Sequence, residues 1–233
     1  MKILTSITTV LGADWQAQLQ ESAALGLEEI AVFLTGLNPA DRKVFYREAK
    51  KIKFKKIPFV HIRHDFTAQE IGYLAKEFKT EKVNIHFIKE HLPRYDISEF
   101  KKIIYVENHP GHSIGDDELA VAEEIIKKYA GICLDVAHLE SDRREDAESY
   151  QKYTALLKKY PCGCGHISAV KSDKMYDKEE DRYAYDWHTY KELGEFDYLK
   201  RYEEFLPPIA ALELINSITE QLTAKNYIEK LLR

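Results

Sequence analysis

The sequence predicts an α/β protein, a compact (β/α)8 barrel in a single domain over residues 1–233. Short apolar runs alternate with amphipathic segments along the whole chain, a pattern that favours parallel strands joined by right-handed crossovers. Eight such units can be counted, and barrels of this kind typically need about 250 residues. A doubly wound open sheet is the alternative. The barrel is favoured because six successive strands end on His, Asp or Glu, where a barrel gathers its functional groups.

The expected strands are the apolar runs, which turn residues or polar residues bound on both sides. They cover residues 2–6, 29–34, 56–62, 82–87, 103–106, 131–134, 164–168 and 209–214. Helices are expected between them, with Asp14 and Asn38 as N-caps, Pro39 in a first turn, and Thr67 with Glu70 as a capping box. The helices cover residues 14–25, 67–78, 97–100, 116–129, 146–160, 195–205 and 218–232, and a further helix begins at Pro39 and runs into "AKKIKFKKIP" at residues 49–58.

Composition makes several classes of protein less favoured. A net charge of −5 and a pI of about 6.0 are ordinary for a soluble chain and argue against broad nucleic-acid binding. The cysteines are odd in number and lie in apolar or Gly-rich runs, so they are expected to be reduced: Cys133, Cys162 and Cys164. The N-terminus lacks a signal-peptide core, and no apolar run approaches the roughly 20 residues of a membrane span. We therefore expect a cytoplasmic protein without a membrane partner.

The strand ends carry the residues that point to chemistry. The third to eighth strands end in "HIRHD", "NIHF", "VENH", "LDVAH", "GHIS" and "LELIN". Any one of these side chains alone would be an ordinary surface or hydrogen-bonded group. Gathered in one ring, however, the carboxylates would repel and desolvate one another unless a cation neutralised them. A mixed set of imidazole and carboxylate ligands suits Zn, Mn, Fe or Co better than Ca or Mg.

A second motif lies in the segment after the seventh strand, which reads "DWHTYKELGEFDY" at residues 186–198. Asp186 and His188 alternate about Trp187, so an extended backbone would place both on one side. Arg182 is the best local candidate for contacting a substrate phosphate. Several tyrosines of this segment would either cover the mouth, stack on a sugar or pack the loop down. They are Tyr176, Tyr183, Tyr185 and Tyr190.

The remaining histidines and cysteines carry less weight. His91 is expected at the surface, whereas His109 and His112 are candidates for rim or substrate contacts. Cys162 and Cys164 are only two residues apart and have no second pair, so a structural zinc site is not expected there.

Five strand-end motifs, in order along the chain, resemble those of the xylose isomerase-like TIM barrels. They are "VENH", "CLDVAH", "GHIS", the D-x-H…G-x-x-D stretch and "LELIN". This superfamily contains sugar phosphate isomerases and epimerases as well as apurinic endonuclease IV. The resemblance implies one divalent metal ion bound by four residues, of which the two glutamates also exchange protons with the substrate. These ligands are Glu107, Asp135, His166 and Glu213.

In endonuclease IV the same ring is extended to three zinc ions. The resemblance implies that the additional ligands would be His64, His86, His138, Asp186 and His188. His61 lies in the same segment as His64, and the sequence leaves open which of the two faces the site. His138 would touch either the substrate or a further metal ion.

Two functions follow, with a divalent cofactor of Zn, Mn or Co numbering one to three. In a sugar or sugar-phosphate isomerase or epimerase, Glu107 and Glu213 would move protons while His138 and His188 held hydroxyl groups. The alternative is an endonuclease IV-like phosphodiesterase, which the many histidines favour. The sequence ranks a small-molecule substrate first, because the basic run "KKIKFKK" falls at the opposite barrel face and the loops in "ENHPGHS" and "HISAVKSD" differ from endonuclease IV. A barrel that binds a small ligand without catalysis is a third class.

Overall fold

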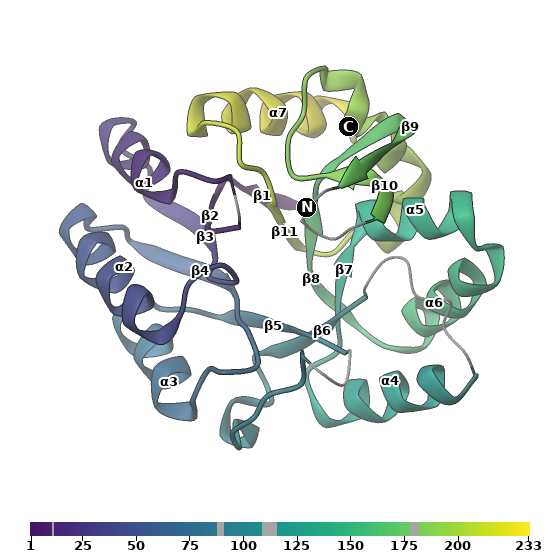
Figure 1. Ribbon diagram of the computed structural model, residues 1–233, viewed down its shortest axis with the longest axis horizontal. Helices are drawn as coiled ribbons and strands as arrows, with labels where there is room; N and C mark the ends of the chain where they lie inside the picture. The colour runs from purple at the N-terminus through teal and green to yellow at the C-terminus, as the bar shows by residue number, and fades with distance from the viewer. Residues whose placement is uncertain (11, 88–90, 109–115, 178–181) are drawn as a thin grey trace.

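One parallel sheet makes up the centre of the protein (Figure 1). The structure, a computed structural model, describes residues 1–10, 12–87, 91–108, 116–177 and 182–233, apart from the side chains at 116–118, 177 and 182. The strands of the sheet are β1 (Lys2–Leu4), β2 (Ser6–Thr8), β3 (Glu29–Phe33), β4 (Lys56–His61), β5 (Lys82–His86), β6 (Ile104–Glu107), β7 (Ile132–Asp135), β8 (Cys162–Ile167) and β11 (Ile209–Leu212). Their order is β1-β11-β8-β7-β6-β5-β4-β3-β2.

The sheet closes because β1 and β2 are consecutive pieces of one strand position. β1 pairs with β11, β2 pairs with β3, and the carbonyl of Thr5 between them accepts the backbone N–H of Ala31 at 2.9 Å. The eight expected strands therefore occupy eight positions around a barrel. This confirms the predicted barrel over the doubly wound open sheet.

Helices surround the barrel (Figure 1). They are α1 (Trp15–Ala24), α2 (Pro39–Ile52), α3 (Ala68–Glu77), η2 (Ser98–Phe100), α4 (Asp116–Lys128), α5 (Val136–Glu145), α6 (Ala147–Lys159), η3 (Leu193–Phe205) and α7 (Ile218–Leu231), where η2 and η3 are 3₁₀ helices. The expected N-caps Asp14 and Asn38 are confirmed. The capping box is only half formed: Thr67 accepts the N–H of Glu70 at 3.2 Å, whereas the carboxylate of Glu70 binds Arg42.

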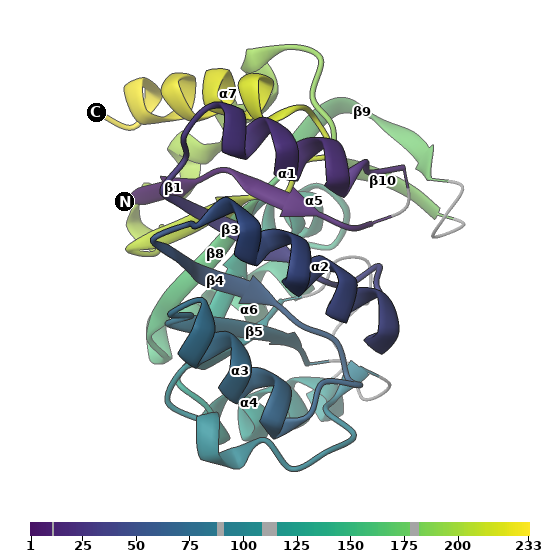
Figure 2. The same cartoon turned by 90° about the vertical axis from the view of Figure 1, so that its left-hand side faces the viewer.

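The structure adds one helix and one hairpin that the sequence did not predict. Helix α5 begins directly after β7, and its first seven residues are all buried although several of them are polar. Its sequence therefore shows no separate apolar and polar faces by which an amphipathic helix is recognised. After β8, β9 (Ala169–Asp177) and β10 (Arg182–Trp187) pair antiparallel, with Tyr183 opposite Tyr176. Figure 2 shows this hairpin extending on the side toward which the barrel strands run.

A small set of apolar side chains fills the barrel interior, apart from the larger core between sheet and helices. We call this set the apolar floor: Leu4, Ala31, Phe33, Phe59, Cys133, Cys164, Ile209 and Ala211. All three cysteines are free, as expected. The apolar floor lies beneath the strand ends that carry the site residues, so those residues stand on a water-excluding base.

The basic run at residues 50–56 is neutralised by neighbouring glutamates. Lys50 lies 2.5 Å from Glu77, and Lys56 lies 2.9 Å from Glu81. The run joins the end of α2 to the start of β4, which places it at the barrel face opposite the strand ends, as predicted. No helix in the described part of the chain is long and apolar enough to cross a membrane.

Candidate metal centre

Four strand-end side chains meet in the barrel mouth. One ligand atom from each lies within 4.8 Å of the others, and all four side chains are buried. They come from the ends of β6, β7, β8 and β11, and the register of the sheet places Asp135 directly beside His166. We call this set the quartet: Glu107, Asp135, His166 and Glu213. It is the same set that the sequence resemblance implied as metal ligands.

The imidazole of His166 is the centre of the quartet. Its Nδ1 lies 3.2 Å from Oε1 of Glu107, 3.3 Å from Oε2 of Glu213 and 3.9 Å from Oδ2 of Asp135. The ring packs edge-on against Phe33, with 4.8 Å between the ring centroids. Packing against the apolar floor therefore fixes the direction in which Nδ1 points.

The quartet fits a divalent cation. Oδ2 of Asp135 and Nδ1 of His166 are buried and have no hydrogen-bond partner within the described residues. Buried polar atoms without partners are rare in folded proteins, and three carboxylates in an apolar barrel are costly unless a cation neutralises them. A donor set of carboxylate oxygens and one imidazole nitrogen is suited to a transition metal ion or zinc.

Within the quartet, the pKa values of the three carboxyl groups do not all shift in the same direction. Burial raises the pKa of Glu107 and that of Asp135. Burial also opposes a charge on Glu213, but His188 and His166 outweigh it and lower the pKa of Glu213 to about 2. Burial likewise opposes a proton on His166, yet Glu107 and Glu213 raise its pKa well above the ordinary range.

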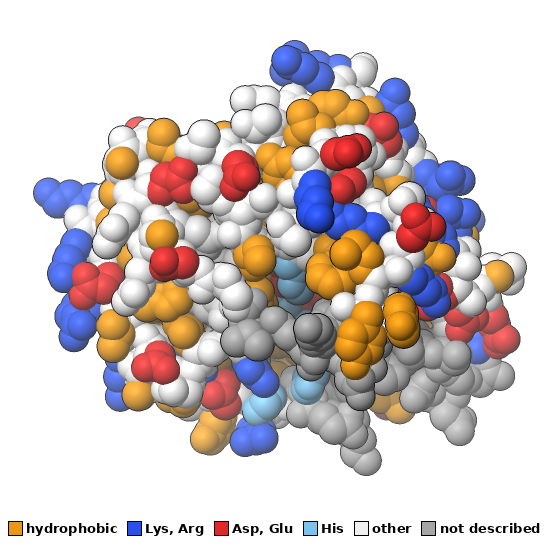
Figure 3. Space-filling model, turned by 45° about the horizontal axis from the view of Figure 1, so that its top comes forward, with side chains coloured by type: hydrophobic (Ala, Val, Ile, Leu, Met, Phe, Trp, Pro, Cys, Tyr) orange, Lys and Arg blue, Asp and Glu red, His pale blue; other side chains and the backbone are white. Residues whose placement is uncertain are grey.

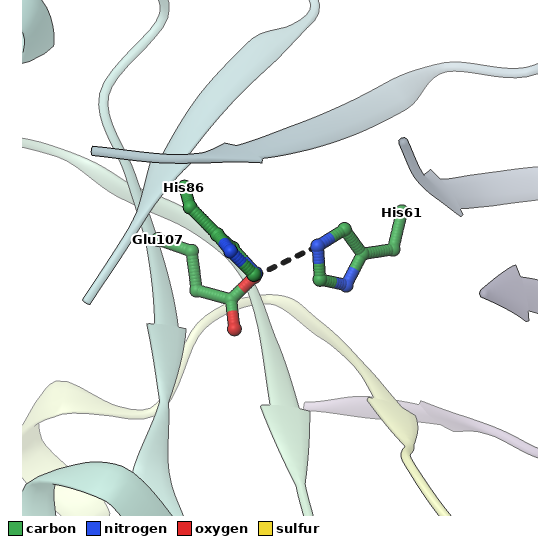
Figure 4. Close-up of side chains that lie close together, drawn as sticks. All are labelled: His61, His86 and Glu107. Carbon is green, nitrogen blue, oxygen red and sulfur yellow. Dashed lines mark ion pairs between the residues drawn. The ribbon is translucent and has the colours of Figure 1, made fainter. Parts of the chain in front are cut away.

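A second group of possible ligands shares Glu107 with the quartet. Nε2 of His61 lies 3.5 Å from Oε2 of Glu107, and Nε2 of His86 lies 3.6 Å from the same oxygen. Figure 4 shows the two imidazoles and the carboxylate turned toward one another from β4, β5 and β6. Burial lowers the pKa of His61 well below its usual value, so this ring stays neutral, the form that binds metal ions.

The structure answers which histidine after β4 faces the site. His61 is the last residue of β4 and belongs to the buried cluster, whereas His64 lies beyond the strand with its ring 6.4 Å from that of His91. Within the described residues, no group of three converging ligand atoms includes His64. His91, which was expected at the surface, is half-buried, and its Nδ1 lies 3.1 Å from Nδ1 of His86.

The other expected ligands gather beside the quartet. His138 lies in the first turn of α5 rather than in a loop, with its Nε2 3.7 Å from both Oδ2 of Asp135 and Oδ2 of Asp186. Burial opposes a charge on His138, but Asp135 and Asp186 outweigh it and raise its pKa to about 9. His188 follows β10, with its Nε2 3.8 Å from Oε1 of Glu213 and about a third of its side chain exposed.

Three supporting residues were missed in the sequence. The side chain of Asn108 accepts the backbone N–H of Asp135 at 2.8 Å and donates to its carbonyl at 3.0 Å, which holds the end of β7 in place. Asn84 donates to Oε2 of Glu107, and Ser141 donates to Oδ1 of Asp186 at 2.8 Å. Asn108 stands inside the "VENH" motif and could have been suspected. Ser141 could not, because its helix was not predicted.

The rim of the mouth contains aromatic side chains. Figure 3 shows histidine side chains in a hollow of this face, with hydrophobic side chains beside it. The rings of Tyr176 and Tyr183 are exposed and 5.3 Å apart, and the guanidinium of Arg144 lies 4.8 Å over Tyr185. Tyr190 instead packs its loop down, since its hydroxyl donates to the carbonyl of Glu220 at 2.8 Å. Three candidates from the sequence lie outside the part of the chain that the structure describes: His109, His112 and the side chain of Arg182.

Comparisons with known proteins bear on the fold. No protein-family model matches the sequence, and neither does any curated protein. A solved D-tagatose 3-epimerase-like protein is 14% identical, with a TM-score of 0.56 over 98% of this chain and 97% of that one. N-acetylneuraminate lyase from Mycoplasma synoviae is 14% identical, with a TM-score of 0.50 over 99% of this chain and 78% of that one.

A third similar structure is an AP endonuclease of family 2 from Brucella melitensis, 11% identical, with a TM-score of 0.49 over 95% of this chain and 96% of that one. Identities this low carry information about the fold and not about the reaction. Together with the strand order, the likeness to the epimerase-like protein confirms that this chain has the TIM-barrel fold predicted from its strand-end motifs.

Proposed function

We propose that this protein is a divalent-metal-dependent isomerase or epimerase of a sugar or sugar phosphate. The observation that carries the proposal is the placement of both Glu107 and Glu213 beside Nδ1 of His166, at 3.2 and 3.3 Å. Glu107 ends β6 and Glu213 follows β11, and β7 and β8 separate these two strands in the sheet. The two glutamates therefore reach one cation position from separate strands, which supplies two carboxylates for the two steps of a proton transfer.

The quartet would hold the cation, which as a Lewis acid stabilises negative charge developing on a hydroxy-carbonyl substrate. Glu107 and Glu213 then do the proton transfer: one removes the proton from the carbon beside the carbonyl, and the other returns it.

Two histidines are placed to orient the substrate. His138, whose pKa is raised to about 9 by Asp135 and Asp186 against the effect of burial, is a charged donor for a substrate oxygen. His188 is the more exposed of the two and borders the opening beside Glu213. Beneath them the apolar floor keeps water from the reacting carbon.

The test is proton exchange in heavy water. Metal-loaded protein is incubated in D₂O with a panel of free and phosphorylated aldoses and ketoses, and deuterium beside the carbonyl is read by NMR. We expect incorporation with one substrate class, its loss in Glu213→Gln, and its retention in Glu203→Gln, which changes an exposed glutamate. Full exchange by Glu213→Gln would remove Glu213 from this role, and no exchange with any sugar would contradict the proposal.

A second candidate function is metal-dependent hydrolysis of a phosphodiester, and the shared Glu107 favours it. His61 and His86 converge on the glutamate that already belongs to the quartet, so two cations could bind side by side. Adjacent divalent cations neutralise the attacking and leaving oxygens of such a reaction. Metal analysis separates the two candidates: one ion per chain supports the isomerase, whereas two or three ions together with cleavage of abasic-site DNA or of bis(p-nitrophenyl) phosphate support the hydrolase.

A further inference from the structure

The second nitrogen of the His166 imidazole has an unusual neighbour. Nε2 lies 3.7 Å from Sγ of Cys133, inside the apolar floor. We propose that the thiol of Cys133 is a positioning group for the metal site: it accepts the Nε2–H of His166 and so holds the tautomer that presents Nδ1 to the cation. The inference rests on the proposed cation site. It assigns a role in that site to a residue that the sequence analysis described only as a reduced cysteine in an apolar run.

The backbone places Cys133 directly beneath the quartet. Cys133 stands two residues before Asp135 on β7, so both side chains point to the same side of the strand, into the barrel. In the parallel register, Cys133 is level with Cys164 of β8, and Asp135 is level with His166. Cys133 and His166 are both completely buried. The contact is therefore fixed by two neighbouring strands and not by a mobile loop.

The chemistry of imidazole makes a partner at Nε2 necessary. A neutral imidazole carries one ring hydrogen, and a nitrogen that binds a cation must be the one without it. Because Nδ1 faces the three carboxylates of the quartet, the hydrogen belongs on Nε2. Most members of the apolar floor offer no acceptor, and the thiol sulfur of Cys133 meets the N–H there.

The choice of a thiol has a consequence for the cation. Metal-bound histidines usually donate their second N–H to a carboxylate or a carbonyl, which makes the imidazole a stronger ligand. A thiol sulfur is a weak acceptor. It therefore orients the ring while adding little to its basicity, and a cation bound by such a ring keeps more of its own electrophilic character.

The experiment compares three variants of the full chain: Cys133→Ala, Cys133→Ser and, as a matched control, Cys164→Ala. Cys164 lies in the same layer and is equally buried, so its truncation repeats the loss of volume. Zinc affinity is measured by competition with a chromophoric chelator, after circular dichroism has verified each fold. We expect Cys133→Ala to lose about 10- to 100-fold in affinity. Cys133→Ser, whose shorter side chain keeps an acceptor at a longer distance, should bind with an affinity between those of Cys133→Ala and the wild type, and Cys164→Ala should change affinity by less than about threefold.

Two further measurements use the wild type and therefore test the role of Cys133 even if Cys133→Ala fails to fold. Long-range ¹H–¹⁵N NMR of the zinc-loaded wild type should identify His166 as protonated at Nε2 and metal-bound at Nδ1; the opposite tautomer would overturn the inference. Absorption of the cobalt-loaded protein should lack a sulfur-to-cobalt charge-transfer band, because such a band would make Cys133 a direct ligand. Equal affinity losses in Cys133→Ala and Cys164→Ala would reduce its role to packing.

The same data separate this inference from the proposed function. If the wild type binds no divalent cation, both are overturned. If it binds one and catalyses proton exchange, but Cys133→Ala binds it equally well, only the role of Cys133 is lost.

Discussion

Oδ1 of Asp135 accepts the backbone N–H of His138 at 2.9 Å, so the last residue of β7 is also the N-cap of α5. Its other oxygen, Oδ2, is left for the quartet. One carboxylate thus ends a strand, starts a helix and offers an oxygen to the quartet. The cap also sets the first turn of α5, which brings His138 beside Asp186.

Mutation should separate the roles of the two oxygens of Asp135, one in capping α5 and one in the quartet. Asp135→Asn keeps a carbonyl oxygen for the cap but removes the negative charge, so we expect metal affinity to fall at least tenfold while the metal-free protein stays as stable as the wild type within about 1 kcal/mol. Asp135→Ala removes the cap as well and should cost about 1 kcal/mol more. Urea unfolding in the presence of a chelator, together with zinc titration, measures both effects. Equal stability of the two variants would contradict the capping role.

Removing the proposed cation should lower thermal stability, because it would bind the folded quartet and not the unfolded chain. At a metal concentration 100 times the dissociation constant, binding stabilises a protein by about 2.7 kcal/mol. For a chain of this length that corresponds to a Tm difference of roughly 5–10 °C. Thermal unfolding followed by circular dichroism, with zinc and then with excess chelator, measures the shift. Glu213→Ala should show a much smaller one, and an unchanged Tm in the wild type would count against a resident cation.

His61 and His64 should behave differently although they are three residues apart. His61→Ala removes a nitrogen that faces Glu107 at 3.5 Å, so a protein that binds more than one zinc ion should lose about one ion per chain. His64→Ala should keep the full count, since His64 lies outside the converging groups of the described residues. Elemental analysis after dialysis gives the count. Loss of zinc from His64→Ala alone would show that the loop, and not the strand end, supplies the ligand.

Glu140 should make stability depend on acid pH. Burial opposes its charge, but Arg143, Tyr202 and Arg144 outweigh burial and lower the pKa of Glu140 to about 2. A carboxyl whose pKa is lower in the folded than in the unfolded chain stabilises the fold above about pH 4.5, and this contribution disappears as the pH falls toward 2. We expect it to be about 2–3 kcal/mol.

The measurement for Glu140 is the unfolding free energy of wild type and of Glu140→Gln between pH 6 and pH 2. The difference between them should be largest near pH 6 and should shrink as the pH falls. Glu203→Gln, at an exposed position, should follow the wild type throughout. A constant difference across the pH range would mean that Glu140 contributes through packing and not through its charge.

The sequence by itself determined the eight barrel strands and most of the helices between them, and its resemblance to the xylose isomerase-like TIM barrels implied the residues of the quartet. The strands could be predicted because parallel strands buried on both faces read as apolar runs, and a polar residue ending each run must lie at one edge of the sheet. Helix N-caps could also be predicted, because they depend only on neighbouring residues. Asp14 and Asn38 are examples.

Only the tertiary structure decided the rest. The sequence did not predict helix α5, because polar and apolar residues are buried together in its early turns and its sequence shows no amphipathic stripe. The choice of His61 over His64 depends on where β4 ends, a boundary that sequence fixes only to within a few residues. The contacts of Asn108 with Asp135 and of Cys133 with His166 join different strands and depend on their register. Register arises from packing between distant segments, and no local pattern of residues encodes it.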